Sequence, residues 1–503
     1  MPRSMSIRLV SIFVFTCCLG FTDLAVNAQT QVQPGQVLIS ELRLRGPAGV
    51  EDEFIEIYNN TDSPLIVQSL DGSAGWAVVV SNGQITGSIC VIPNGTEIPA
   101  RGHFLCANSN GYSLSGYPSG NPVPLASPSP SPTPGPFAET TPNVTWGFDV
   151  GDGSGVALFG TTNGTNFTAA TRLDAFGFTS SPALFREGNG FASIITANTE
   201  HTYYRDLRAV TPKDTNDNAA DFRLVGTAPN IQVPLLGAPG PENLNSPTLN
   251  NNIPGTLLDP SVAASQVPNR ERRPTGEPNA DLGTILIRRT MTNNTGLPVS
   301  RLRFRVIDIT TLGTPPSECA GCADVRALTS FDGEAAVGGQ LVTVRGVRLE
   351  EPPTQAAGGG LNASVSADFI TFSSPLLPGH SVNIEFKLGV MRTGAFRFYV
   401  AIEAQNGASI ILLRPARKPF TDVSTGRRSG LQMRTPTSGL GGKDHADSLR
   451  PALMAERPAS ASTPQAPAAA TWQPFVLRTL APAPRVESKK RQRRARSVRR
   501  TRR

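Results

Sequence analysis

The sequence is poor in the residues that most often carry enzyme chemistry. Its 503 residues include 4 histidines and 6 cysteines, and none of the histidines lies in a zinc-protease pattern. No phosphate-binding loop or dinucleotide-binding fingerprint occurs either. These absences predict a non-catalytic protein that carries no cofactor.

Long hydrophobic runs are also scarce. The main run spans residues 9–21, follows Arg3 and Arg8, and precedes small residues at 26–28, an order typical of a secretory signal peptide covering residues 1–28. No later run approaches the roughly 18 apolar residues that a membrane-spanning helix needs. The sequence therefore predicts an exported protein, secreted or associated with the cell envelope, without a transmembrane segment.

Helical patterning is lacking as well. The chain has 48 glycines and 44 prolines, and no long stretch repeats apolar residues at the spacing of three and four that a helix needs. This predicts an all-β chain with a first β-sandwich at 36–243, a linker at 244–277 rich in Pro, Asn and Gly, and a second β-sandwich at 278–415. Residues 416–503 are predicted to be disordered, and the proline-rich residues 121–136 a solvated insertion.

Two extended runs open the first domain. Residues 37–44 and 53–58 are separated by glycines and a proline that cannot all lie in one strand. In the second run Ile55 and Ile57 fall on one face, and the even-numbered residues, among them Glu56, fall on the other. We expect a pair of antiparallel strands whose second member has one buried face and one partly wet face.

Short motifs occur in order along this domain, at residues 39–41, 52–59, 75–79, 101–105, 153–159, 172–178 and 217–222. Together they resemble the bacterial branch of the lamin-tail family. The resemblance implies an immunoglobulin-like sandwich that interacts with protein or glycan, here enlarged by insertions at 108–142 and 180–200, with Trp76 as the core tryptophan. The family-motif positions with a structural role are Glu41, Glu53, Phe54, Ile55, Glu56, Asn59, Trp76, Asp174, Asp221 and Phe222.

The second domain is predicted from a series of extended runs with turn residues between them. They lie at residues 282–293, 300–311, 323–330, 340–349, 363–373, 381–391 and 395–405, the number and spacing typical of an immunoglobulin-like sandwich. Between residues 301 and 306 arginines alternate with apolar side chains. This alternation gives one apolar and one cationic face and excludes a helix.

The cysteines outside the predicted signal peptide are Cys90, Cys106, Cys319 and Cys322. Because exported proteins meet an oxidising compartment, we predict the disulfides Cys90–Cys106 and Cys319–Cys322 and no free thiol. The spacing of the second pair is also that of a redox or zinc motif. No further cysteine pair accompanies it, so a loop disulfide is favoured and the other two remain alternatives.

One acidic stretch has two interpretations. Asp214, Asn216, Asp217 and Asn218 place oxygen-bearing side chains close together, as calcium loops do. The glycine and the distant glutamate of an EF-hand are absent, and the same residues fit a turn in which Asp and Asn side chains bind backbone amides. The turn is favoured, with calcium binding as the alternative.

The positive charge of the chain lies at its C-terminus. Ten of the last fifteen residues are Lys or Arg, and without them the net charge of +7 becomes −3, with 36 basic against 39 acidic residues. We predict that this segment binds a polyanion; a solvated extension without a ligand is the alternative. The predicted polyanion-binding residues are Lys489, Lys490, Arg491, Arg493, Arg494, Arg496, Arg499, Arg500, Arg502 and Arg503.

These features together predict an exported, non-catalytic structural or binding protein whose basic tail attaches it to an envelope or extracellular polyanion. Two alternatives stay open. Lamin-tail modules also occur beside catalytic domains, which would make the chain a secreted enzyme on phosphoester or glycan substrates, or an accessory of such a hydrolase. The basic tail alone would fit an extracellular nucleic-acid binder, although it lacks the aromatic residues that stack on bases.

Overall fold

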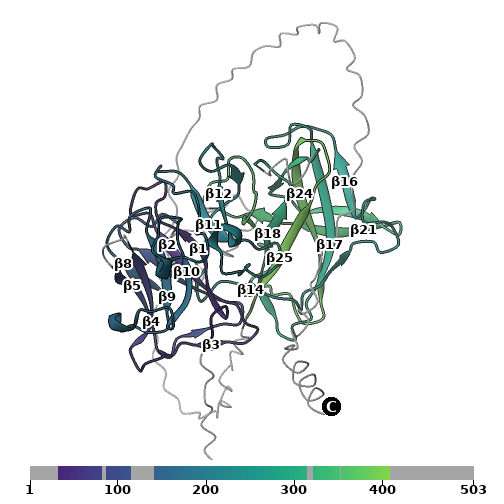
Figure 1. Cartoon of the computed structure of the whole chain (residues 1–503). Helices are drawn as coiled ribbons and strands as arrows, with labels where there is room; N and C mark the ends of the chain where they lie inside the picture. The colour runs from purple at the N-terminus through teal and green to yellow at the C-terminus, as the bar shows by residue number, and fades with distance from the viewer. Residues whose placement is uncertain (1–31, 82–85, 115–140, 314–320, 352, 408–503) are drawn as a thin grey trace, which may run out of the picture.

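The structure is a computed structural model that describes residues 32–81, 86–114, 141–313, 321–351 and 353–407. The predicted signal peptide, the proline-rich insertion, Cys319 and the basic tail lie outside these residues. Within them the chain is almost entirely β and forms two sandwiches (Figure 1), which confirms the predicted fold class. Among the described helices, none is long and apolar enough to cross a membrane.

The first sandwich consists of a seven-stranded sheet in the order β13-β12-β11-β1-β2-β7-β8 and a four-stranded sheet in the order β10-β9-β4-β5. A small ladder, β3 with β6, lies beside them, together with a short helix, α1 (Asn218–Asp221), and the 3-10 turns η1 (Gly164–Asn166) and η2 (Ala183–Phe185). The strands are β1 (Val37–Arg43), β2 (Phe54–Asn59), β3 (Leu65–Ile66), β4 (Gly75–Ser81), β5 (Thr86–Pro93), β6 (Glu97–Ile98), β7 (His103–Asn108), β8 (Val144–Trp146), β9 (Gly155–Phe159), β10 (Arg172–Phe176), β11 (His201–Arg205), β12 (Phe222–Gly226) and β13 (Leu235–Leu236).

The core of the first sandwich contains Trp76, as predicted. Its side chain is fully buried, and its indole Nε1 donates a hydrogen bond to the backbone oxygen of Gln68 at 2.8 Å. The residues 180–200, which were interpreted as an insertion, also contribute to the interior, because Phe185 and Ile195 are buried. That segment is therefore part of the packed domain.

A disulfide joins the two sheets of this sandwich. Cys90 on β5 and Cys106 on β7 are bonded and buried, which confirms the first predicted pair. Cys322 is also disulfide-bonded, but Cys319 lies outside the described residues, so the second predicted pairing stays a prediction.

The second sandwich has a five-stranded sheet in the order β14-β25-β18-β23-β22 and a larger sheet in the order β15-β17-β24-β21-β20, to which β16 and β19 add by pairing with β17 and β24. Its strands are β14 (Thr248–Leu249), β15 (Gly255–Leu257), β16 (Arg270–Arg273), β17 (Thr284–Thr292), β18 (Val299–Ile309), β19 (Asp324–Leu328), β20 (Gly333–Val337), β21 (Gln340–Gly346), β22 (Arg348–Leu349), β23 (Ser364–Ser366), β24 (Ser381–Arg392) and β25 (Phe398–Asn406).

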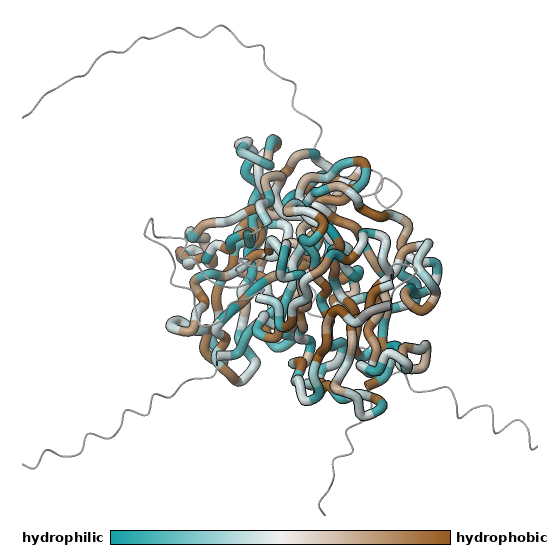
Figure 2. The backbone as a smooth tube through the Cα atoms, turned by 90° about the vertical axis from the view of Figure 1, so that its left-hand side faces the viewer, coloured by the Kyte–Doolittle hydropathy of each residue, from teal (hydrophilic) through white to brown (hydrophobic). Residues whose placement is uncertain are grey.

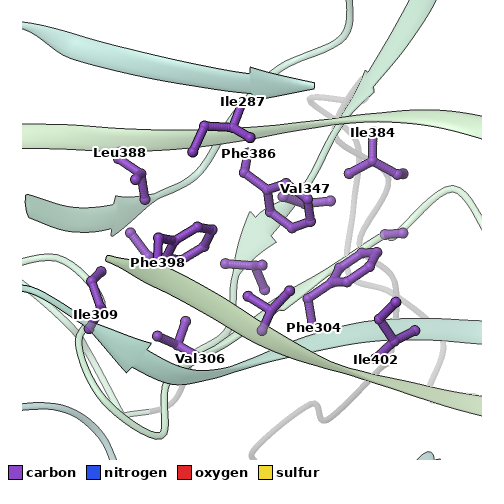
Figure 3. Packing of buried hydrophobic residues seen from close by; sticks show 14 of the residues in the cluster. Ile287, Phe304, Val306, Ile309, Val347, Ile384, Phe386, Leu388, Phe398 and Ile402 are labelled. Atoms are coloured by element: carbon purple, nitrogen blue, oxygen red, sulfur yellow. The ribbon is translucent and has the colours of Figure 1, made fainter. Parts of the chain in front are cut away.

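Aromatic and branched side chains from both sheets fill the space between them (Figure 3). Phe386 on β24 lies with its ring edge-on to Phe304 of β18, at 4.9 Å between ring centroids, and to Phe398 of β25, at 5.9 Å. Hydrophilic residues occupy many outer loops (Figure 2). Leu302, Phe304 and Val306 lie in this core, as the alternation at 301–306 predicts.

The predicted linker at 244–277 is wrong. In the structure these residues form β14, β15 and β16, which pair with β25 and β17 of the second sandwich. Strands of 2 to 4 residues are too short to show an alternating pattern, so they are specified by the neighbours they pair with and not by their own sequence. The second sandwich therefore begins before residue 278.

The prediction that one face of β2 is partly exposed to solvent is also wrong. All six residues of β2 are buried. Phe54 is covered by Leu114 and Tyr112, whereas Glu56 faces the second domain and the chain that leads to it. The alternation correctly separated two faces, but both faces of the strand are covered.

Candidate functional site at the domain interface

The arginine face of β18 is buried. Arg301, Arg303 and Arg305 are 4%, 1% and 5% exposed, although they point away from the apolar core of their own sandwich. Arg305 lies where β1 and β11 of the first domain approach β18 and β25 of the second (Figure 1), and the connecting residues 235–243 pass between the domains. Because a buried guanidinium is costly unless it is paired, this face requires carboxylate partners.

Two glutamates supply those partners. Glu242, fully buried in the connecting segment, contacts the guanidinium of Arg303 and lies 2.8 Å from Nη2 of Arg305. Glu403, on β25, lies 2.6 Å from Nε of Arg303 and 2.9 Å from Nε of Arg305. Burial by itself would raise the pKa of Glu403, but the two guanidiniums outweigh it and hold that pKa below its usual value. Both arginines thus lie between a glutamate of the connecting segment and one of the second domain.

His103 extends this pairing into the first domain. Its Nδ1 lies 3.0 Å from Oε1 of Glu56, and its Nε2 lies 2.8 Å from Oε2 of Glu242. Glu56 also accepts hydrogen bonds from Oγ of Ser40 at 2.5 Å and from the backbone nitrogen of Glu242 at 2.6 Å. Glu242 therefore contacts side chains of both domains at once.

The side-chain amide of Asn362 forms a second connection between the two domains. Glu41, on β1, accepts hydrogen bonds from the backbone nitrogen of Gly240 at 2.9 Å and from Nδ2 of Asn362 at 3.1 Å. Oδ1 of Asn362 in turn accepts a hydrogen bond from Nη1 of Arg305 at 2.9 Å. Burial, with a further contribution from the neighbouring Glu56, raises the pKa of Glu41 to about 7. We refer below to Glu41, Glu56, His103, Glu242, Arg303, Arg305, Asn362 and Glu403 as the interface cluster.

The space inside the interface cluster is small. A cavity of about 40 Å³ lies there, lined among others by Tyr58, His103, Arg305 and Glu403. That volume holds a few water molecules at most, since one water needs roughly 10–15 Å³ on this measure, and ligand sites usually measure about 300–1,000 Å³. The cluster is thus better suited to joining two domains than to receiving a substrate.

Two groups of side chains among the described residues have ligand atoms within 4.8 Å of one another, as a metal site needs. The first is Glu56, His103 and Glu242, and the second is Asp174, Glu187 and Asp214. In each group an arginine already lies against the carboxylates: Arg303 and Arg305 against Glu242, and Arg205 against the second group, with Nη2 at 2.7 Å from Asp174. Positive charge is therefore supplied by the protein itself.

The stretch Asp214 to Asn218, with calcium binding as one alternative, forms the turn that leads into α1. Asp217 accepts a hydrogen bond from the backbone nitrogen of Ala219 at the start of this helix. The side-chain oxygen of Asn218 accepts hydrogen bonds from the backbone nitrogens of residues 177 and 187, and its side-chain nitrogen donates one to the backbone oxygen of residue 175. Asn216 has a positive φ of 60°. Asp214 lies 3.6 Å from Nη1 of Arg205. The contact between Asp217 and Ala219 is of the kind that the turn interpretation predicts, and calcium binding stays the alternative.

The other family-motif residues also have structural contacts. Glu53 accepts hydrogen bonds from Asn108, Trp146 and the backbone nitrogen of Val150 at 2.8, 3.3 and 2.9 Å, and burial outweighs these donors and raises its pKa to about 8. Asn59 donates to the backbone oxygens of residues 63, 98 and 99. Ile55 and Phe222 are buried in the main core, and Asp221 accepts hydrogen bonds from Thr215.

No family model matches the chain, and no curated protein matches it. The resemblance to lamin-tail domains therefore stays a prediction that rests on the motifs in the sequence.

Sequence reasoning identified two members of the interface cluster, Glu41 and Glu56, through the family motifs. It missed the roles of Glu242, Glu403 and His103, which lie far from one another in the sequence. A signal did exist: three arginines alternate along one strand of a chain that has a net excess of acidic residues outside its last fifteen positions. A cationic strand face of this kind predicts an acidic surface against it.

Burial of the carboxylates makes stability depend on pH. The pKa of Glu41 and of Asp368 is raised to about 7, and that of Glu53 and of Glu187 to about 8, so the folded state holds protons that the unfolded state releases near pH 4 to 4.5. Stability contributed by these groups is fully present below about pH 4, and it is lost progressively from about pH 4.5 up to the folded-state pKa values of about 7 to 8. His201 acts in the opposite sense: its buried ring has a pKa lowered to about 4, and its contribution is lost below about pH 6.5.

Because four carboxyl groups act against one histidine, we expect the melting temperature to be highest near about pH 5 and to fall by several degrees towards about pH 8.5. Calorimetry across this range measures it. In Glu41→Gln, which fixes the neutral form of one of these groups, the decline above pH 6 should be smaller. A melting temperature that stays level or rises between pH 6 and pH 8.5 would contradict the prediction.

Proposed function

We propose that this chain is an exported, non-catalytic structural or binding protein, in which two sandwiches act as one body and a basic tail attaches that body to a polyanion of the cell envelope or extracellular space. The first sandwich is proposed to be a lamin-tail-like module of immunoglobulin type. The interface cluster is the observation that carries this proposal. Its ionisable side chains contact one another across the domains and enclose a cavity of only about 40 Å³.

The pairing pattern supports a structural role for these charges. A general acid or base needs a reacting group within hydrogen-bond reach, whereas the carboxylates of Glu242 and Glu403 contact Arg303 and Arg305. Separating the two domains would break the contacts between His103 and Glu242 and between Glu41 and Asn362, so the cluster favours a fixed arrangement of the domains.

The Cys90–Cys106 disulfide supports the proposed export. The bond is buried between the two sheets of the first sandwich, and structural disulfides persist mainly in oxidising compartments. The mostly apolar run at residues 9–21 and the small residues after it fit the proposed export signal.

Removal of residues 489–503 should abolish salt-sensitive retention of the full protein on a phosphocellulose column. The ten cations of this segment would release counterions from a polyanion, so retention should weaken steeply with salt. Thermal unfolding of the two sandwiches should be unchanged. Extraction of the producing cell with and without high salt gives the corresponding measurement on the envelope.

The matched control replaces the same ten Lys and Arg residues with Gln, which keeps the length of the tail and removes its charge. It should behave like the truncation. Retention that survives both changes would show that the sandwiches carry the attachment and would refute a polyanion-binding tail.

A further inference from the structure

An open cleft of about 410 Å³ lies on the outer face of the larger sheet of the second sandwich. Its floor comes from β17 and β24, where Leu286 pairs with Lys387 and Arg288 pairs with Glu385. The residues that alternate with them, such as Ile287 and Phe386, face the core. Arg273 of β16 closes one side, and residues 331–334, which lead into and begin β20, close the other. The volume is within the range of small-molecule sites, about 300–1,000 Å³.

The polar groups of the floor are held in place by one another. Arg288, whose side chain is 3% exposed, lies 2.7 Å from Glu385 through Nε and 2.6 Å from Glu271 through Nη2. Lys387 lies 2.5 Å from Glu277. Because these side chains are already fixed, a ligand that binds to their remaining hydrogen-bonding positions does not have to order them, which lowers the entropic cost of binding.

The charges that line the cleft are nearly balanced. They comprise three cations, Arg273, Arg288 and Lys387, and four carboxylates, those of Glu277, Asp332, Glu334 and Glu385. A ligand with strong charge of either sign would therefore meet a group of like charge, and a neutral ligand would not. Carboxylates accept and guanidinium groups donate several hydrogen bonds each, which suits a ligand with many neighbouring hydroxyl groups.

An exposed aromatic ring stands in the wall of the cleft. Phe331 lines the cleft and is 63% exposed, so its ring is open to a ligand. The face of an aromatic ring carries negative electrostatic potential, so it attracts the weakly positive C–H groups on the face of a sugar ring. An extended peptide would gain most from a free strand edge, but this cleft lies over a sheet face.

We propose that this cleft binds a neutral glycan, with Phe331 against a sugar face and the fixed Arg and Glu side chains on its hydroxyl groups. The site is separate from the basic tail, and binding here requires no polyanion. It gives the second sandwich a ligand of its own.

The test is affinity electrophoresis of the full chain in gels that contain a soluble neutral glucan, mannan or galactan, followed by a glycan array that includes acidic oligosaccharides. We expect retardation by at least one neutral polysaccharide at a high salt concentration that prevents binding by the tail. Phe331→Ala should weaken binding about tenfold or more, which corresponds to about 1.4 kcal/mol, and Glu334→Ala should weaken it less.

The matched control is Leu341→Ala, since Leu341 is 70% exposed on the neighbouring strand β21 and does not line the cleft. It should bind as the unchanged chain does. Any one of three results would overturn the proposal. These are absence of binding to every neutral glycan, binding by Phe331→Ala that equals binding by the unchanged chain, and binding to acidic glycans or peptides alone. Because retention on phosphocellulose is measured separately, failure of the cleft proposal is distinguishable from failure of the tail proposal.

Discussion

Replacing Glu242 with alanine should destabilise the protein by about 3–5 kcal/mol, the usual cost of leaving buried charges without a partner. Glu242 is fully buried and contacts Arg303, Arg305 and His103 together. Its removal leaves Arg305 paired with Glu403, and Arg303 paired with Glu403 and with the more distant Glu350 at 3.9 Å. It also removes the contact between the connecting segment and His103. The loss should fall mainly on the contact between the two domains.

Urea unfolding followed by circular dichroism measures this effect. The unchanged chain should unfold in one transition, because its domains stabilise each other, and Glu242→Ala should show two transitions or a single one at clearly lower urea. The control is Asp62→Ala, which removes an acid whose side chain is 79% exposed beside Arg101; exposed ion pairs contribute roughly 0–1 kcal/mol. Similar losses in the two variants would refute a special role for the cluster.

A double-mutant cycle with Arg305→Ala isolates the pairwise contribution. Because the side chains of Glu242 and Arg305 are 2.8 Å apart, the two changes should not add, and the coupling should be about 0.5–3 kcal/mol. Strict additivity would mean that the two side chains contribute to the interface independently of each other.

The sequence predicted those elements whose pattern is local. Strands such as β17, β18 and β24 have 9 to 12 residues, long enough for an alternation of period two to be visible. The Cys90–Cys106 bond was predicted from the few cysteines of a chain expected to reach an oxidising compartment, and the burial of Trp76 was implied by the resemblance of its strand motif to lamin-tail domains. In each case the deciding information lies within one strand or in one residue type.

The interface cluster could not be predicted in the same way. Glu56, Glu242, Arg303 and Glu403 come from distant parts of the chain, and only the packing of one sandwich on the other brings them together. The face of β2 that carries Glu56 was expected to be wet because a charged residue on a strand is usually exposed. Here the charge is compensated across the interface, so the rule fails at the residues that join the domains.

Trp76→Ala should lower the free energy of unfolding of the first sandwich by about 3–5 kcal/mol, the usual cost of removing a large aromatic side chain from a core. The ring is fully buried between the two sheets, and its Nε1 donates a hydrogen bond to the backbone oxygen of Gln68 at 2.8 Å. Alanine would leave a cavity in a region that the Cys90–Cys106 bond prevents from collapsing freely.

Urea unfolding of the oxidised protein, followed through the near-ultraviolet signal of the remaining aromatic residues, measures the change. Trp76→Phe keeps most of the apolar contact and loses the hydrogen bond to Gln68, so it should cost about 1–3 kcal/mol, less than the alanine variant. Phe148→Ala removes an aromatic side chain that is 49% exposed in the same domain and should cost less than about 1 kcal/mol. Because the three variants differ in buried area, the order of their losses tests the position of the core: if Trp76→Ala unfolds as easily as Phe148→Ala, the tryptophan does not hold the two sheets together.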